Sequence, residues 1–341
     1  MELPYRFSEP PSLDLSIVIV SFNTRDLLID CLRSVHRHTR EIAFETFVVD
    51  NGSKDGSPQA VREKFPDAIL IQNSGNAGFS RANNRAIRRA RGRYVVLLNS
   101  DTLLIENCFR EIVRYMDERP EYSIITPRVY DGNGKLCSMR LWEDTPRDAF
   151  WRILGKYDVA GEYGKMGKPG PKEVETIGGS CFVVRRSLFE TIGLLDENYF
   201  LYNEEDDFCR RARRSGQKVC YYPDASIKHL HGKSTHQREV REKVIVETYK
   251  SNLYFYSKYY PPVWNRVLRA LYKFTFLAGA VHSLWNRLTG KSSEMADDSV
   301  SLKLRLLFMR VPKTGGNNVS GSSTVANGPA ESLQDKSDFC R

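Results

Sequence analysis

Four short apolar runs alternate with helix-like segments over the first hundred residues, and this alternation limits the fold more than any other feature. Each run reads as a buried strand. The runs are LSIVIV (15–20), FETFVVD (44–50), AILIQN (68–73) and RYVVLL (93–98). After the first run, Leu28, Cys31 and Val35 recur at helical spacing. Strands that alternate with helices predict βαβ units and an α/β, doubly wound, mostly parallel sheet.

Polar side chains follow the predicted strands at their ends. Asn23, Asp50, Asn73 and Asp101 all fall at or just after a strand end. Ligands of such sheets bind beyond the carboxyl ends of the strands, so we expect these residues to share one site. The alternative is that they are helix caps and turn formers, as Asn and Asp often are. Four such residues at one edge favour the site.

The stretch VVLLNSDT (95–102) ends an apolar strand in a carboxylate, Asp101. A carboxylate at this place is suited to Mg²⁺ or Mn²⁺, hard cations that prefer oxygen ligands and often bridge to a diphosphate. The tripeptide Asn99-Ser100-Asp101 is also typical of an ordinary turn, so the stretch alone does not distinguish a metal site from a turn.

The charge of the chain is uneven. The net charge is +9, and residues 236–290 hold nine Lys or Arg against three Glu. A basic excess favours anionic partners. These residues are also aromatic and helical in pattern, which fits either a helical lid over the core or a surface that docks on a membrane. Residues 1–13 are a Pro-rich lead, and residues 291–341 are polar and of low complexity, so we expect disorder there.

The cysteines and the chain ends indicate a reducing, cytoplasmic setting. The seven cysteines form no CxxC pair, which argues against a disulfide framework or a zinc site. The N-terminus shows no apolar signal region, and no stretch approaches the roughly 18 apolar residues that span a bilayer.

Several motifs occur in a fixed order: SIVIVSFNTRDLL, VVDNGSKDGS, NSGNAGFSRANN, RYVVLLNSDT, then GGSCFVVRRSLFETIGLLDENYFLYNEEDDFCRR and HLHGKS. Together they resemble family 2 glycosyltransferases of the GT-A fold, especially the rhamnosyltransferase-like branch. The resemblance covers residues 14–235, which are expected to form one GT-A domain followed by the helical region 236–290.

The resemblance implies the residues that bind the nucleotide and the donor sugar. In this family the first strand end and the acid after the second strand hold the nucleotide, and the third loop and its helix add weaker contacts. In this sequence the implied residues are Ser21, Asn23, Asp50, Asn51, Ser53, Asn76, Asn83 and Asn99.

The resemblance also implies the metal ligands. Asn99-Ser100-Asp101 stands where the family has D-x-D, and the first Asp is Asn here, so one formal charge is missing. Asp101 is expected to bind Mg²⁺ or Mn²⁺. HLHGKS matches the family's H-x-x-G-x-S pattern with His229 as second ligand, and His231 remains an alternative.

A general base is implied in the acidic run that opens the helix at 203–216. Inverting transfer needs a group that takes the acceptor's proton. The family pattern places this base at Glu205, with Glu204 and Asp207 as supporting acids, although Glu204 and Asp206 stay open as alternatives. Gly178-Gly179 is expected to let the acceptor approach the backbone closely.

The implied function is transfer of a hexose or deoxyhexose from a nucleoside-diphosphate sugar, of the dTDP or UDP type, to a glycan or lipid-linked acceptor in polysaccharide biosynthesis. Peripheral membrane contact and a homodimer are further expectations, and nucleic acid is not an expected partner. The alternatives are a nucleotidyltransferase or a non-catalytic carbohydrate-binding module. Both a nucleotidyltransferase and a Rossmann dehydrogenase need a Gly-rich loop after the first strand, and SFNTRD has no glycine.

Overall fold

The computed structural model describes residues 5–137, 139–154, 169–230, 238–289 and 294–309. Its strands are β1 (Leu13–Ser21), β2 (Phe44–Asp50), β3 (Ile69–Gln72), β4 (Gly92–Asn99), β5 (Thr102–Leu104), β6 (Tyr122–Tyr130), β7 (Lys172–Val174), β8 (Cys181–Arg185) and β9 (Lys218–His229). Its helices are α1 (Arg25–His38), α2 (Ser57–Lys64), α3 (Phe79–Ile87), α4 (Cys108–Glu118), α5 (Pro146–Ile153), α7 (Arg186–Ile192), α8 (Glu204–Arg214), α9 (Arg238–Tyr259), α10 (Pro262–Leu288) and α11 (Glu294–Phe308).

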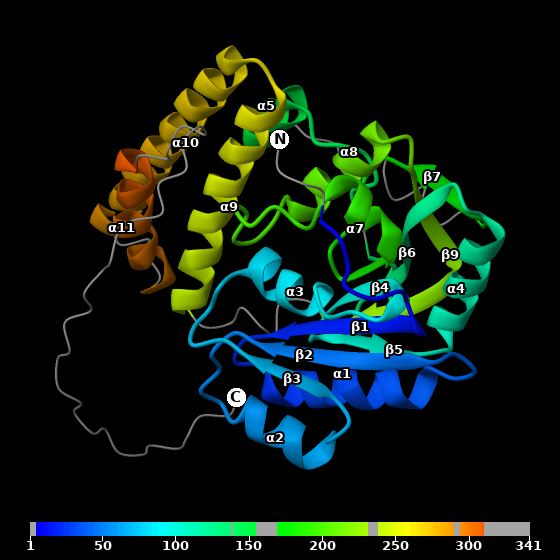
Figure 1. The fold of residues 1–341 in the computed structure, drawn as a ribbon. Helices are drawn as coiled ribbons and strands as arrows, with labels where there is room; N and C mark the ends of the chain where they lie inside the picture. Colours follow the sequence, from blue (N-terminus) through cyan, green and yellow to red (C-terminus); the bar gives the residue numbers. More distant parts are fainter. Residues whose placement is uncertain (1–4, 138, 155–168, 231–237, 290–293, 310–341) are drawn as a thin grey trace.

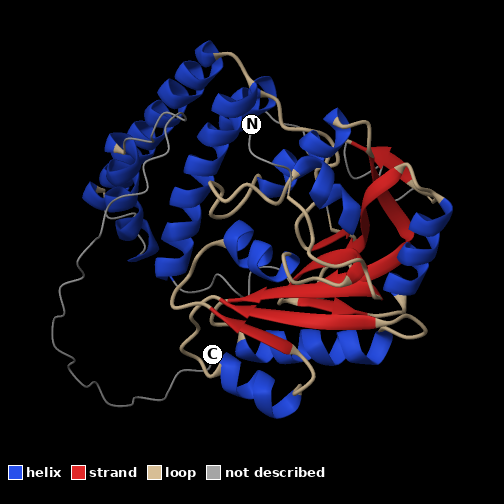
Figure 2. Cartoon of the chain, in the orientation of Figure 1, coloured by secondary structure: helices blue, strands red, loops and turns tan. Residues whose placement is uncertain are grey.

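The strands form one mixed sheet in the order β3-β2-β1-β4-β8-β6-β9-β5, with β7 paired to β9. The pairs β3–β2, β2–β1, β1–β4 and β6–β9 are parallel, whereas β8, β5 and β7 run against their neighbours. The predicted α/β, mostly parallel sheet is confirmed, and helices cover both of its faces (Figure 2).

The central strands are apolar throughout because both of their faces are buried. Ile17 and Ile19 of β1 pack in a cluster with residues of α1 and α4. Val18, between them, points to the opposite face and packs with residues of α3, α7 and α8. Side chains alternate along a strand, so a run without polar interruption fills two cores at once. Figure 1 shows α1 and α3 on opposite sides of β1.

Two elements differ from the sequence prediction. In the sequence, KVCYYP and ASIKHLHG each have the pattern of a short strand and together predict two strands, but β9 is continuous from Lys218 to His229. A shift in its register with β6 lies between the pairs Pro127–Tyr222 and Arg128–Ser226. The shift lies around Pro223, which has no N–H to donate to a ladder, so the strand bulges there instead of ending.

The second difference is at the C-terminus. Residues 291–341 were expected to be disordered, but α11 forms within them, and Leu302 and Leu306 are buried. These two side chains join a third apolar cluster that includes Tyr249 and Tyr256 of α9 and Leu268 of α10. Apolar residues at helical spacing therefore have a core to pack in, which a local composition count does not reveal.

The cysteines that the structure describes are all free thiols. No helix among the described residues is long and apolar enough to cross a bilayer.

Candidate active site

A cleft of about 610 Å³ opens at the carboxyl ends of β1, β2 and β4. The start of β8 also lies at the cleft, because β8 runs antiparallel to β4. Ser180, the residue before β8, therefore lies beside Asn99 at the end of β4. The start of α8 and the side chains of Lys243 and Val244 on α9 close the cleft. Its polar lining includes Asn51, Asn76, Asn99, Asp101, Glu205 and His229.

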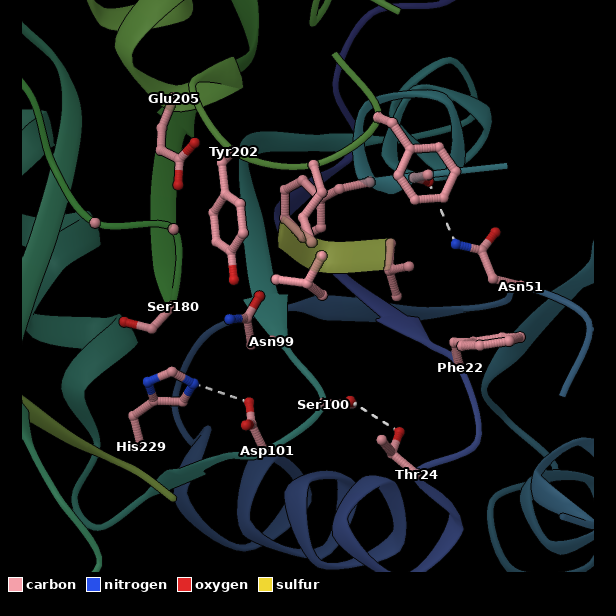
Figure 3. A pocket seen from close by; sticks show the side chains of 18 of the residues that line it. Phe22, Thr24, Asn51, Asn99, Ser100, Asp101, Ser180, Tyr202, Glu205 and His229 are labelled. Carbon is pink, nitrogen blue, oxygen red and sulfur yellow. Dashed lines mark hydrogen bonds and ion pairs between the residues drawn. The ribbon is translucent and has the colours of Figure 1, made fainter. Parts of the chain in front are cut away.

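Asp101 and His229 lie side by side on one wall of the cleft (Figure 3). The Nε2 atom of His229 is 2.9 Å from Oδ1 of Asp101. The short strand β5 pairs with the end of β9 and sets Thr102 opposite His229, and the N–H of Leu230 donates to the carbonyl of Asp101. The structure thus brings together the two predicted metal ligands, 128 residues apart. His231 lies outside the described residues.

A chain of buried hydroxyl groups runs behind this wall. The hydroxyl oxygen of Thr24 is 2.9 Å from that of Ser21 and 3.0 Å from that of Ser100. Thr24 and Ser100 line the cleft, whereas Ser21 does not and is buried beneath them. The chain fixes the first strand end against the loop that carries Asp101.

The loops after β2 and β3 form the next part of the wall. Asn51 Nδ2 donates to Oδ1 of Asn76 at 3.4 Å and to the carbonyl of Gly78 at 3.3 Å. Asn76 Oδ1 also accepts from the N–H of Gly78. Asn51 and Asn76 therefore line the cleft as predicted, and their amides are held by the neighbouring loop.

Four other predicted binding residues do not line this cleft. Asp50 Oδ2 accepts from the N–H groups of Gly52 and Ser53, and Asn23 bonds to Ser53 and Lys54, so the three side chains of Asn23, Asp50 and Ser53 join the loops after β1 and β2. Asn83 donates to the carbonyl of Phe79 within α3. In this structure the side chains of these residues hold the backbone of the loops after β1 and β2 and of helix α3, and they do not face the cleft.

Glu205 lies on the wall opposite Asp101 and His229 (Figure 3). A Cβ at Gly179 would stand 2.5 Å from its Oε1 atom, so any larger residue there would displace the carboxyl group of Glu205. Burial, and then the negative charge of Asp206, raises the pKa of Glu205 to about 7, against the opposing charge of Arg140. A carboxyl group that titrates near neutral pH is suited to accept a proton.

Glu204 and Asp206 are buried beside Glu205. Burial, and then the charge of Glu205, raises the pKa of Glu204 well above its usual value. Asp206 instead pairs with Arg140 and accepts from the hydroxyl of Thr176 at 2.7 Å. Neither lines the cleft, and of the three acids weighed as the base only Glu205 does.

Asp207, predicted as a supporting acid, is fully buried and lies away from the cleft. It pairs with Arg211 at 2.8 Å and with Lys258 of α9, and the hydroxyl of Tyr259 donates to it. Successive helix residues turn by about 100°, so its side chain points to α9 while that of Glu205 points to the cleft. In this structure Asp207 therefore links α8 to α9 and does not reach the cleft, in contrast to its predicted role as a supporting acid.

Tyr202, Arg140 and Lys243 are among the cleft residues that the sequence prediction missed. Tyr202 is 41% exposed, and it and Asn203 have φ angles of 68° and 67°, a conformation that non-glycine residues rarely adopt. Arg140 lines the cleft and also pairs with Asp144. Lys243 holds its ammonium 4.4 Å from the centre of the Phe200 ring. In the sequence, only Tyr202 carries a signal of such a role, since it precedes the acidic run that begins at Glu204. This signal is weak.

The residues of the first wall fit a divalent cation in part. A carboxylate oxygen and an imidazole nitrogen are donors that Mn²⁺ accepts, and both face the cleft. Among the described residues there is no group of three or more His, Cys, Asp or Glu that is able to hold a metal. A bound ion at Asp101 and His229 would take its remaining ligands from a diphosphate and water.

The fold is that of GT-A glycosyltransferases. A solved structure of GalNAc-T7 with UDP, GalNAc and Mn²⁺ matches with a TM-score of 0.50 at 18% identity, over 72% of this chain and 50% of that one. The model of the family described as glycosyl transferase family 2 matches residues 16–193, just over half of the chain. The chain belongs to this family and is a glycosyltransferase.

Two relatives extend the comparison. The chain is 31% identical over 222 residues to the low-salt glycan biosynthesis hexosyltransferase Agl10 of Haloferax volcanii, over 62% of this chain and 66% of that protein. It is 26% identical over 273 residues to the N-acetylglucosaminyl-diphospho-decaprenol L-rhamnosyltransferase of Mycobacterium tuberculosis, over 75% of this chain and 88% of that protein.

Proposed function

We propose that the protein transfers a hexose or deoxyhexose from a nucleoside-diphosphate sugar to a hydroxyl group of a glycan or lipid-linked acceptor, with inversion at the anomeric carbon. One observation carries the proposal: Glu205 faces Asp101 and His229 across a single cleft of about 610 Å³. A base on one wall and a charge-holding pair on the other are what a single displacement requires.

Glu205 acts as the base in this reaction. The acceptor oxygen forms a bond to the anomeric carbon while the bond from this carbon to the diphosphate oxygen breaks. The hydroxyl proton passes to the carboxylate of Glu205, and the electron pair of the broken bond leaves with the diphosphate. The absence of a side chain at Gly179 leaves room for the carboxylate of Glu205 itself.

The opposite wall holds the donor. The amides of Asn51 and Asn76 are placed to contact the nucleotide, and Asn99 to contact the sugar ring. Asp101 and His229 hold Mg²⁺ or Mn²⁺, which supplies positive charge for the leaving diphosphate when it is bound.

The names of the relatives support the choice of substrates. One is a hexosyltransferase of glycan biosynthesis, and the other transfers L-rhamnose to a lipid-linked N-acetylglucosaminyl diphosphate. By analogy we assign this chain a role in glycan or cell-envelope polysaccharide synthesis. The uridine or thymidine diphosphate donor rests on the family resemblance alone. A lipid-linked acceptor would bring the reaction to a membrane surface, and we propose its cytoplasmic face.

A panel of sugar nucleotides tests the proposal. The purified chain should release a nucleoside diphosphate from one or a few donors, and EDTA should stop the release until Mg²⁺ or Mn²⁺ is restored. Release of pyrophosphate would instead identify a nucleotidyltransferase. Binding of sugars with no turnover for any donor would identify a binding module.

A further inference from the structure

The helix α10 exposes a continuous apolar stripe along its whole length. Phe274 is 65% exposed, Trp285 64% and Leu288 84%. Exposed apolar surface of this size on a soluble domain marks an interaction site. The stripe is made of Val263, Val267, Phe274, Leu277, Val281, Leu284, Trp285 and Leu288.

The stripe keeps to one face of the helix. Its members follow one another at intervals of mostly three, four or seven residues, which places them within an arc of about 100°. The other face of α10 is already occupied: Leu268 packs in the cluster with α9 and α11, and Lys303 of α11 bonds to Gly279 and Ser283. A helix of 27 residues is about 40 Å long. The stripe is therefore a long, narrow surface on the side of α10 opposite to these contacts.

The charge of α10 selects its partner. The helix contains four Lys or Arg and no Asp or Glu. Arg266 and Lys273 are exposed and lie at one edge of the stripe. A second copy of this chain docked through the same face would set these cations against each other. An anionic bilayer satisfies both the apolar stripe and the cations that border it, and Trp favours the headgroup region.

We propose that α10 docks flat on an anionic phospholipid bilayer, with its stripe at the boundary of headgroups and acyl chains. This surface is limited to one face of α10. The sequence allowed a docking surface over residues 236–290 as one of two alternatives. The aromatic side chains Tyr249 and Tyr256 of α9 are buried in the third cluster. On α10, Tyr272 and Phe276 pack against the same cluster, whereas Phe274 and Trp285 are exposed in the stripe. The two alternatives for the C-terminal region thus apply to different helices: α9 closes the cleft, and α10 docks.

This docking deepens the proposed work on a lipid-linked acceptor. The helix α9 lines the cleft with Lys243 and Val244 and packs on α10 with Leu253 and Tyr256. Only one layer of helix, about 10 Å thick, separates the cleft from the docking helix. A headgroup anchored by its lipid in the bilayer would lie near the cleft.

Sedimentation with vesicles tests the docking without donor or acceptor, so its result is independent of the proposed transfer. The full chain should bind vesicles of phosphatidylcholine with about a third phosphatidylglycerol more tightly than vesicles of phosphatidylcholine alone, and added salt should weaken the binding. The variant F274S/L277S/W285S should lose binding at least tenfold. Arg266→Gln with Lys273→Gln should remove the preference for anionic vesicles.

The matched control is Ile105→Ser, which removes an exposed apolar side chain, 43% exposed, outside α10 and should leave binding unchanged. Circular dichroism and nucleotide-sugar binding would show that the variants are folded. Equal vesicle binding by the folded triple variant and the wild type would overturn the proposal. A dimer in solution that the triple variant dissociates, without vesicle binding by the wild type, would assign the stripe to a second copy instead.

Discussion

The two walls of the cleft present carboxylates in opposite surroundings. Asp101 has an imidazole nitrogen 2.9 Å away, and hydroxyl groups lie in the loop around it. Glu205 is packed against a glycine and sits beside two other buried acids, and among the described residues no cation forms an ion pair with it. The second wall raises the pKa of Glu205 to about 7 and so favours a group that gains a proton, whereas the first wall pairs its carboxyl group with an imidazole. Two side chains with the same functional group thus have different neighbours, which suits them to different roles.

The largest effect is expected at the second wall. Glu205→Gln keeps the shape of the side chain but removes its ability to accept a proton, so transfer should fall by about 10²- to 10⁴-fold. Calorimetry should still detect binding of the nucleotide sugar, because the donor contacts lie on the other wall. Glu63→Gln, on the exposed side of α2, is the control. Near-normal turnover by Glu205→Gln would remove the distinction between the walls.

At the first wall, Asp101→Asn should weaken metal-dependent donor binding. The amide keeps a hydrogen-bonding group beside His229 but carries no charge for the cation, and we expect a loss of about a hundredfold in kcat/KM. A titration with Mn²⁺ measures the effect, and raising the Mn²⁺ concentration should recover part of the activity. An unchanged titration would show that this carboxylate holds no metal.

The pH profile sharpens the comparison further. Glu205 must be ionised to act as a base, and its pKa is raised to about 7 by burial and by Asp206. The value of kcat/KM should therefore rise as pH increases through about 7 and then level off, with about a tenfold fall per pH unit on the acidic side. An acidic limb near 4.3, the pKa of an ordinary glutamate, would contradict the environment described here.

The smallest effect on turnover is expected at Asp207, two residues from the base. Asp207→Asn leaves Arg211 without a charged partner and Lys258 with Asp196 alone, which should destabilise the fold by about 3 kcal/mol. Turnover measured well below the melting temperature should change by no more than about twofold. Thermal unfolding measures the first effect, with the exposed Asp26→Asn as control. A large loss of turnover in a stable variant would return Asp207 to the catalytic group.

The sequence predicts those parts of the site whose position follows from the order of residues along a strand and its loop. Polar residues that follow buried strands must reach the carboxyl edge of the sheet, and Asn51, Asn99 and Asp101 do. The direction of a side chain within a helix depends on what packs against it. Glu205 and Asp207 are therefore alike in the sequence, although one faces the cleft and the other faces α9.

The same limit applies to the C-terminal helices. Tyr256 of α9 and Trp285 of α10 lie in segments that are both rich in aromatic and basic residues. Nevertheless, Tyr256 is 1% exposed and Trp285 is 64% exposed. Contacts with α5 and α11, two helices that do not adjoin α9 in the sequence, decide the difference. Composition alone predicts the region but not which helix faces outward.

The bulge in β9 makes the spacing between Pro223 and His229 a structural requirement. Beyond the shift, each residue of β9 has a fixed partner on β5 or β6, ending with His229 opposite Thr102. Loss or gain of one residue in this stretch would turn the imidazole to the other face of the sheet. Evolution of this segment is then free to exchange side chains at its exposed positions, whereas a change in its length would separate the histidine from its aspartate in one step.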